Sequence, residues 1–252
     1  MELQTALYLI PVGLSDAPLD TYLPARNIDI IRQLRHFVVE NLRSARRFLR
    51  RCDPQFPIDE CEFHELNTHT ERGGIAPWLE PLRHGTPMGL MSDAGCPAVA
   101  DPGSDIVAIA QHEGLRVIPM VGPSSILMAL MASGFNGQGF AFNGYLPVDN
   151  EARAARIREL EATARRTGMT QIFIETPYRN NRMLQVLTQN LRPDTLICVA
   201  ADITDPDHES IRTMSAAQWH KVSVNLDKRP TIFLIHVPSS APAAARKGGA
   251  RR

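Results

Sequence analysis

Ten residues near the middle of the chain carry the strongest structural signal: Met88-Gly89-Leu90-Met91-Ser92-Asp93-Ala94-Gly95-Cys96-Pro97. The apolar run Met88 to Met91 predicts a short buried strand, and a polar turn follows it directly. Ligands of open α/β sheets bind beyond the carboxyl ends of the strands, so an acid and a glycine at this position are candidates to meet a polar small molecule. The alternative is an ordinary turn in which Asp93 and Asp101 cap nearby amides.

Similar apolar runs recur on both sides of this stretch, separated by segments with a helical pattern. The predicted strands are Ala6 to Val12, His36 to Glu40, Phe63 to Asn67, Met88 to Ser92 and Arg116 to Val121. The predicted helices between them are Asn27 to Leu34, Leu42 to Arg51 and Ser104 to His112. Alternation of strand and helix predicts a parallel α/β sheet.

The pattern changes after Val121, where Gly122-Pro123-Ser124-Ser125 forms a turn and a helix start. We place a domain boundary there and expect an N-terminal α/β domain over 1–121 and a C-terminal one over 122–238. The predicted elements of the C-terminal domain are helices Ile126 to Ala132, Glu151 to Arg166 and Asn180 to Leu191, and strands Thr170 to Glu175, Thr195 to Ala200 and Thr231 to Val237. Residues 134–139 are interpreted as a flexible loop. Residues 239–252 are predicted to form a disordered basic tail.

Composition narrows the class of protein. The chain has 252 residues, of which 44% are hydrophobic and 21% are charged, a composition typical of globular proteins. Its 27 basic and 27 acidic side chains balance, so no strong net electrostatic field is expected. Four scattered cysteines without a CxxC pair favour free thiols in a reducing compartment. No apolar run reaches the ~18–20 residues of a membrane span, and the start Met1-Glu2-Leu3-Gln4 is unlike a signal peptide, so a cytoplasmic location is expected.

Two further loops follow predicted strands, Pro11-Val12-Gly13 and Gly122 to Ser125, and three strand-end loops are expected to converge on one pocket. A helix starting at Ser124 and Ser125 offers amide donors to a carboxylate, although ordinary N-capping is the alternative. Glycines 134, 137 and 139 follow a helix in the wrong order for a dinucleotide-binding turn, and no phosphate loop, GxSxG or HExxH motif occurs. His64 and His69 lack metal-ligand spacing, and no metal site is expected.

Seven pieces of the sequence, in order, resemble the tetrapyrrole-methylase-like superfamily of S-adenosylmethionine-dependent methyltransferases. They are Leu7 to Gly13, Glu40 to Arg43, Ser92 to Pro97, Asp101 to Gly103, Gly122 to Ser125, Phe142 to Pro147 and Glu175 to Arg179. Together they span most of the chain, with weaker similarity to about His236. The resemblance is strongest to the branch that methylates a cytidine ribose 2′-hydroxyl in small-subunit ribosomal RNA.

The resemblance implies two α/β domains, an N-terminal parallel sheet and a C-terminal mixed sheet, in a homodimer that binds S-adenosylmethionine in the cleft between the domains. Carried over by position, the implied cofactor-binding residues are Ile10, Pro11, Asp93, Ala94, Gly95, Cys96, Ser125, Ile126, Ala200, Ala201, Pro230 and Thr231.

Two departures from that branch fall on the substrate side. Where the branch has Glu-Asp-Thr-Arg, this chain has Glu40-Asn41-Leu42-Arg43. Where the branch has a loop like Ile-Gly-Asn-Leu, this chain has Val12-Gly13-Leu14-Ser15. The cofactor-side motifs are kept, so methyl transfer is better supported than the identity of the acceptor.

The expected activity is methyl transfer, with Glu40 as the base and Arg43 orienting a phosphate or nucleobase. Between Arg26 and Arg51 the chain has eight arginines against two acids, Asp29 and Glu40. Arg46, Arg47 and Arg50 share a helix face with Arg43 and predict binding to ribosomal RNA of the small subunit. The alternatives are a solvated helix face paired with the acidic stretch Asp59 to Glu71, a small-molecule acceptor such as a tetrapyrrole, or a non-catalytic module that binds S-adenosylmethionine or RNA.

Overall fold

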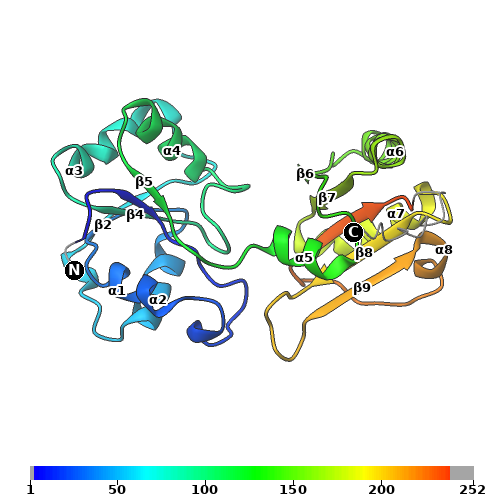
Figure 1. Ribbon diagram of the computed structural model, residues 1–252, viewed down its shortest axis with the longest axis horizontal. Coiled ribbons are helices and arrows are strands. Elements are labelled where there is room, and N and C mark those ends of the chain that lie inside the picture. Colours follow the sequence, from blue (N-terminus) through cyan, green and yellow to red (C-terminus); the bar gives the residue numbers. More distant parts are fainter. Residues whose placement is uncertain (1–2, 239–252) are drawn as a thin grey trace, which may run out of the picture. The chain divides into compact units, whose positions relative to one another are not determined.

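The computed structural model describes residues 3–238 and divides the chain into two compact units (Figure 1). Among the described residues, the first comprises 3–125 with Thr204–Asp207, and the second comprises Ile126–Ile203 with 208–238. The tail expected over 239–252 lies outside the described residues. Each unit has its own sheet, so the predicted pair of α/β domains is confirmed at the level of fold class.

The first unit is built on an all-parallel sheet in the order β3-β2-β4-β1-β5. Its strands are β1 (Leu7–Leu9), β2 (His36–Val39), β3 (Glu62–Glu65), β4 (Met88–Met91) and β5 (Val117–Pro119). Leu9 pairs with both Leu90 and Pro119, and Val39 with Met91. Because the strands run in parallel and in register, their carboxyl ends lie along one edge of the sheet.

Helices cover both faces of this sheet. They are α1 (Ala25–Ile31), α2 (Leu42–Cys52), α3 (Glu80–Arg83) and α4 (Gly103–His112), with 3-10 turns at Leu19–Thr21, Ile58–Glu60, Arg72–Gly74 and Ala76–Leu79. In Figure 1, α1 and α2 lie on one side of the strands and α3 and α4 on the other. Phe37 packs with Phe48 of α2 on the first face, while Val38 packs with Ile106 of α4 on the second. Strand residues therefore alternate between two apolar cores.

The interior of the first unit is tightly filled. Phe37 is fully buried and its ring stacks on Phe63 at 5.3 Å between centroids. A Cβ at Gly89 would lie 2.8 Å from Phe37 and 2.7 Å from Ile10, so the strand next to Phe37 has no room for a side chain. Truncating Phe37 to alanine would leave a cavity and cost roughly 3–5 kcal/mol.

The second unit has a mixed sheet in the order β6-β7-β10-β8-β9, in which only β6 and β7 are parallel. Its elements are α5 (Ser125–Ser133), β6 (Phe140–Tyr145), α6 (Asn150–Thr167), β7 (Thr170–Ile174), α7 (Asn180–Asn190), β8 (Leu196–Ala201), β9 (Ser210–Ser215), α8 (Ala216–Trp219) and β10 (Thr231–His236), with a 3-10 turn at Pro177–Arg179. Side chains of α6, α7 and α8 share one apolar core with the sheet, including Leu160, Leu187 and Trp219.

Local chemistry sets the ends of the longest helix. The Asp149 carboxylate accepts a hydrogen bond from the Ala152 amide at 2.8 Å, which caps the start of α6. Gly168, with φ of 69°, ends it in the left-handed conformation that glycine adopts without strain. Strands β6 and β9 were absent from the sequence-based prediction, as were the short helices α3 and α8. No helix within residues 3–238 is long and apolar enough to cross a bilayer.

Candidate functional site

Three strand-end loops meet at the carboxyl edge of the first sheet. The loop after β1 and the loop after β4 are joined by two hydrogen bonds, from the Val12 amide to the Gly95 carbonyl and back, each 2.9 Å. The Cys96 thiol donates to the Pro123 carbonyl, after β5, at 3.3 Å. The structure therefore brings together the three loops that the sequence singled out.

Two glycines allow this close approach. A Cβ at Gly122 would lie 2.2 Å from Cβ of Pro11, far inside van der Waals contact, so only glycine fits between the two loops. Gly95 has φ of 74°, in the left-handed region that disfavours other residues. These two glycines therefore allow the loops after β1, β4 and β5 to pack directly against one another.

Glu40 and Asp93 are linked across the ends of β2 and β4. The Asp93 amide donates to Oε2 of Glu40 at 3.0 Å, and the Glu40 amide donates to the Met91 carbonyl at 3.1 Å. Oδ1 of Asp93 accepts a hydrogen bond from the Ser44 hydroxyl on α2. The Glu40 carboxyl is thus held in place, and the Asp93 carboxylate lies toward α2.

Burial raises the pKa of Glu40 above its ordinary value, and the negative charges of Asp93 and Asp101 raise it further. The hydrogen bond from the Asp93 amide opposes this shift. The pKa of Asp101 is also raised by burial, although amides including those of Gly103 and Ala98 donate to it. A fixed carboxyl with a raised pKa is a candidate to accept a proton.

Asn41 stands where the resembling branch has aspartate, and it holds the start of α2. Its Oδ1 accepts hydrogen bonds from the Arg43 amide at 2.9 Å and the Ser44 amide at 3.1 Å, so it is the N-cap of α2. The carboxylate of Glu65, the last residue of β3, accepts a hydrogen bond from the Leu42 amide at 3.0 Å. Asparagine and aspartate cap helices about equally well, so the replacement costs little stability.

The arginines of α2 lie on its solvent-exposed side, where the sequence places them, but in different settings. Arg46 lies over the Phe63 ring at 5.6 Å, and Arg50 donates to the Pro54 carbonyl at 2.8 Å. Arg43 and Arg47 are exposed and have no side-chain partner among residues 3–238. None of these four forms an ion pair with the described part of the acidic stretch 59–71.

A polar pocket of about 250 Å³ opens between α2 and the loop after β1. Its lining residues from α2 are Ser44, Arg47, Phe48 and Arg51, and the remainder are Val12 to Asp16 with Asp93 and Ala94. Sequence reasoning nominated Arg47 and Asp93 but missed Ser44, Asp16 and Arg51. The missed signal was helical spacing, since Ser44, Arg47 and Arg51 follow one another at three and four residues.

The second unit holds four further predicted cofactor residues, which the structure gathers at one edge of its sheet. Ala201 at the end of β8 pairs with Thr231 at the start of β10, and the Asp202 amide donates to the Pro230 carbonyl at 2.9 Å. Ala200 and Ala201 are fully buried, so their side chains belong to the core. Ser125 and Ile126 lie in the first turn of α5.

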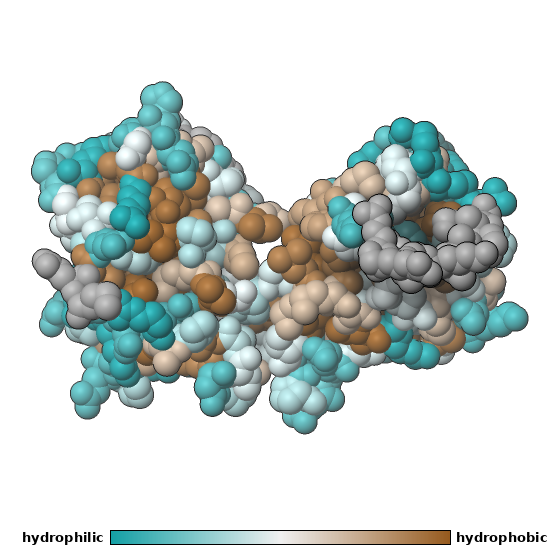
Figure 2. Space-filling model, viewed as in Figure 1, coloured by the Kyte–Doolittle hydropathy of each residue, from teal (hydrophilic) through white to brown (hydrophobic). Residues whose placement is uncertain are grey.

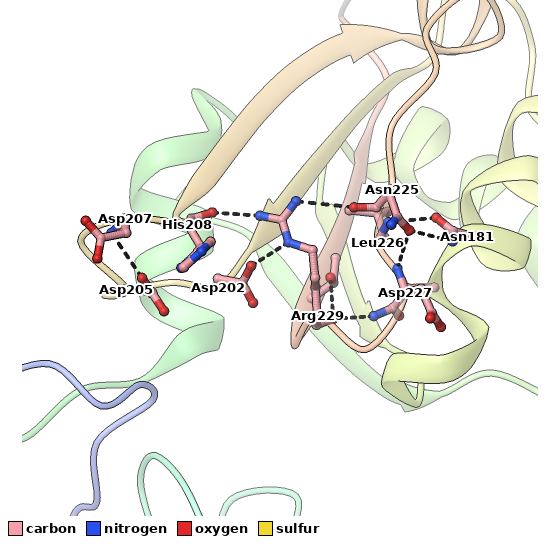
Figure 3. Close-up of polar contacts among 11 residues, drawn as sticks. Asn181, Asp202, Asp205, Asp207, His208, Asn225, Leu226, Asp227 and Arg229 are labelled. Carbon is pink, nitrogen blue, oxygen red and sulfur yellow. Dashed lines mark hydrogen bonds and ion pairs between the residues drawn. The ribbon is translucent and has the colours of Figure 1, made fainter.

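Arg229 fixes the loop that carries Pro230 (Figure 3). Its guanidinium donates to the Asp202 carboxylate at 2.5 Å, the His208 carbonyl at 2.6 Å and the Asn225 carbonyl at 3.3 Å. The Arg229 guanidinium therefore connects Asp202, directly after β8, with His208, before β9, and with Asn225, before β10. The sequence did not single out Arg229, because its partners lie 4 to 27 positions away.

The fold of this chain is similar to that of methyltransferases of known structure. The crystal structure of the methyltransferase CobJ covers 97% of this chain and 97% of its own, with a TM-score of 0.61 and 17% identity. Cobalt precorrin-4 methyltransferase CbiF covers 92% of this chain and 95% of its own, with a TM-score of 0.59 and 14% identity. These likenesses establish the fold.

Residues 6–218 match the family described as Tetrapyrrole (Corrin/Porphyrin) Methylases, and the chain belongs to this family of methyltransferases. Ribosomal RNA small subunit methyltransferase I of Mesorhizobium japonicum is 34% identical over 96% of this chain and 78% of its own. The proteins of that name from Vibrio cholerae and Bacillus subtilis are 29% and 32% identical, over 91% and 82% of this chain and 76% and 66% of their own lengths. The chain therefore spans two thirds to just over three quarters of these relatives.

Within residues 3–238, no group of three or more His, Cys, Asp or Glu side chains is arranged to hold a metal ion. Cys52 and Cys198 are buried free thiols, and Cys61 and Cys96 are partly exposed free thiols. Burial raises the pKa of Cys52 to about 12, which makes it unreactive near neutral pH.

Proposed function

We propose that this chain transfers a methyl group from S-adenosylmethionine to a ribose 2′-hydroxyl of small-subunit ribosomal RNA. Family membership supports methyl transfer, and the similarity to ribosomal RNA small subunit methyltransferases I, at 29–34% identity, supports a ribosomal RNA acceptor. The observation that carries the chemistry is Glu40, anchored at 3.0 Å by the Asp93 amide beside three convergent loops.

The residues at this edge fit the proposed cofactor. S-adenosylmethionine carries a carboxylate, hydroxyls and an adenine, all of which backbone amides and carbonyls recognise. At this edge Asp93 and Ala94 are exposed and Gly122 is partly exposed, so these residues are accessible to a bound molecule. When bound, the cofactor supplies an electrophilic methyl group. The residues proposed to hold it are Ile10, Pro11, Asp93 to Cys96, Ser125 and Ile126, with Ala200, Ala201, Pro230 and Thr231 for the adenine.

The main contribution of the protein is positioning. Holding a donor and a nucleophile in near-attack geometry lowers a barrier by roughly 7–11 kcal/mol. Glu40 is proposed to accept the proton of the ribose hydroxyl, because its pKa is raised and its carboxyl is fixed. Arg43, exposed one turn away at the start of α2, is proposed to orient the acceptor phosphate.

A tetrapyrrole acceptor and a non-catalytic role are less well supported. The corrin methyltransferases are under 20% identical and share only the fold. With 6% aromatic residues, the chain has few rings to cover a large flat macrocycle. In the non-catalytic alternative, the departures at Asn41 and Leu42 would mark a lost activity. Asn41, however, caps α2, and Glu40 is held by the Asp93 amide.

The proposal includes a homodimer in the cytoplasm, where ribosomal subunits are made. Apolar side chains gather on the surface over α5 (Figure 2). Met131 is 82% exposed and Leu127 is 50% exposed, and Tyr145 and Val148 of the same unit are also exposed. A second copy of the chain is the proposed cover for this surface, and sedimentation of a monomer at micromolar concentration would contradict it.

The test is transfer of labelled methyl groups to small ribosomal subunits from a strain that lacks the gene. Wild-type protein is expected to label the small-subunit RNA, and Glu40→Gln is expected to lose the label while it still binds S-adenosylmethionine by calorimetry. Cofactor binding by the wild type without transfer to any RNA would favour the non-catalytic alternative. Transfer to a small molecule extracted from the same cells would favour the tetrapyrrole class.

A further inference from the structure

We propose that the pocket between α2 and the loop after β1 is the subsite for one nucleotide of the RNA acceptor, with Arg47 and Arg51 on its phosphate. The inference rests on the proposed function and specifies where the acceptor binds. The sequence predicted that Arg46, Arg47 and Arg50 bind the RNA. The proposed subsite instead uses Arg47 and Arg51, on the adjacent face of α2.

The face is defined by helical spacing and by packing. Ser44, Arg47 and Arg51 lie along one stripe of α2, with Phe48 buried beneath them. Ser44 is tied to Asp93, so the floor of the pocket is continuous with the edge that carries Glu40. A group bound on this stripe therefore lies next to the proposed base.

The opposite wall is held rigidly in the first unit. The Ser15 hydroxyl donates to the Thr204 carbonyl at 3.0 Å and accepts from the Ala17 amide at 3.2 Å. A Cβ at Gly13 would lie 2.6 Å from the Tyr22 hydroxyl, so the loop rests directly on that ring. A fixed wall opposite a helix stripe makes a preformed site, which lowers the entropy cost of binding.

The pocket is lined by two arginines, Arg47 and Arg51, and by two aspartates, Asp16 and Asp93. Asp93 is hydrogen-bonded to Ser44, whereas the two arginines are available to an anion. Arg47 has no side-chain partner among residues 3–238, and Arg51 is only partly engaged. One Arg51 nitrogen donates to the Ala17 carbonyl at 2.7 Å, and another lies 3.5 Å from the carboxylate of Asp16, whose side chain is 95% exposed. Such an exposed ion pair is weak and is readily exchanged for a phosphate.

Size favours a nucleotide over a macrocycle. The pocket volume of about 250 Å³ is below the ~300–1,000 Å³ typical of sites for drug-sized ligands. A phosphate with one ribose or base fits this scale, with Ser44 and Asp93 available to polar groups. A tetrapyrrole does not.

The other arginines of the helix are differently placed. Arg46 is stacked on Phe63 and Arg50 is held by the Pro54 carbonyl, so neither lines the pocket. We therefore expect Arg51, which the sequence did not nominate, to matter more for RNA binding than Arg46.

The test measures binding of unmethylated small-subunit ribosomal RNA, made by transcription, at several salt concentrations. Arg47→Gln and Arg51→Gln are each expected to weaken binding roughly tenfold, as expected for losing a charged hydrogen bond. Each is also expected to reduce the salt slope by about 0.7–0.9, the value for one lost phosphate contact. Arg51→Lys keeps the positive charge but loses the two-pronged guanidinium, so its RNA affinity is expected to lie between those of the wild type and Arg51→Gln.

Asp16→Asn is expected to change the RNA affinity in the opposite direction. Because Asp16 competes with the phosphate for Arg51, its removal is expected to tighten binding by about two- to fivefold, the range for an exposed ion pair. The matched control is Arg116→Gln. Arg116 is an exposed arginine of the same unit at the amino end of β5, on the edge opposite the pocket, and its replacement is expected to leave binding unchanged.

The outcomes separate the two proposals. If the wild type methylates the RNA but Arg47→Gln and Arg51→Gln keep its affinity and salt slope, the pocket assignment is overturned and the proposed function stands. Equal losses in Arg116→Gln or Arg46→Gln overturn the assignment as well, since they indicate general attraction. If the wild type transfers no methyl group to any RNA, the proposed function fails and the nucleotide subsite fails with it. Melting temperatures identify any variant that has lost its fold.

Discussion

Replacing Gly122 by alanine is expected to disrupt the edge where the three loops meet. The added Cβ would lie 2.2 Å from Cβ and 2.5 Å from Cγ of Pro11. Reaching an ordinary contact of 3.4 Å requires a shift of about 1.2 Å. The Pro11 ring cannot rotate away, because proline fixes φ and because the flanking Ile10 and Val12 amides are hydrogen-bonded at 2.8 and 2.9 Å.

The Gly122 side is equally constrained. The Asn27 amide donates to the Val121 carbonyl at 2.7 Å, and Cys96 donates to the Pro123 carbonyl. The overpacking is therefore shared by both loops and is expected to cost about 1–3 kcal/mol. At about 2–4 °C per kcal/mol for a chain of this size, the melting temperature should fall by roughly 2–12 °C.

Scanning calorimetry measures that loss, and isothermal titration measures binding of S-adenosylmethionine by the same variant. Gly74→Ala is the matched control, because a Cβ at Gly74 meets nothing within 4 Å. We expect Gly122→Ala to melt lower and bind the cofactor more weakly than Gly74→Ala. A Gly122→Ala protein that melts and binds like the wild type would refute the close approach of Gly122 and Pro11.

The other predictions concern single groups at the same edge. Burial raises the pKa of Glu40, so the protonated form is favoured in the folded state and this stabilisation is lost as pH rises through the folded pKa. Activity that needs the carboxylate should therefore fall on the acid side at a higher pH than for an ordinary glutamate, and Glu40→Gln should melt no lower than the wild type at pH 7. A pH–rate profile checks the loss of activity on the acid side, and a loss at the pH of an ordinary glutamate would contradict the expectation. A melting curve checks the stability of Glu40→Gln. Asp93→Asn is expected to weaken cofactor binding by about 1.5–3 kcal/mol in a titration, whereas normal cofactor binding with impaired transfer to RNA would assign the carboxylate to the α2 pocket alone. Alkylation at pH 8, followed by mass spectrometry, should modify Cys61 and Cys96 before Cys52. Saturating S-adenosylmethionine should slow the alkylation of Cys96 only. Equal protection of Cys61 would count against a direct contact between Cys96 and the cofactor.

The central strands of the first sheet, β2 and β4, were predictable because they are almost wholly buried. Continuous apolar runs such as Met88 to Met91 and His36 to Val39 match the observed strands within one residue, since parallel strands leave little polar signal to confuse their limits. The convergence of the strand-end loops followed from the parallel topology.

Strands β6 and β9 were missed for the opposite reason. Both are edge strands with mixed polarity, as in Ser210-Ile211-Arg212-Thr213, where exposed polar positions hide the pattern. Their pairing depends on partners elsewhere in the chain, such as Ile211 with Ala200.

The candidate site shows the same division between local and long-range information. Glu40, Asp93 and the three loops were found because motif and strand end coincide in the sequence. Arg51 and Asp16 were missed because the pocket they line forms only when the loop after β1 packs against α2. Arg229 was missed because its three acceptors come from three separate segments.

The proposed function is tested most directly by the nucleoside that receives the methyl group. Small-subunit RNA from a strain that lacks the gene is incubated with the protein and labelled S-adenosylmethionine, digested to nucleosides and resolved by chromatography with mass spectrometry. The account predicts label in a 2′-O-methylated nucleoside, with cytidine expected from the resemblance, and no such label with Glu40→Gln. Label on a nucleobase, or no label in RNA while the protein binds the cofactor, would contradict it.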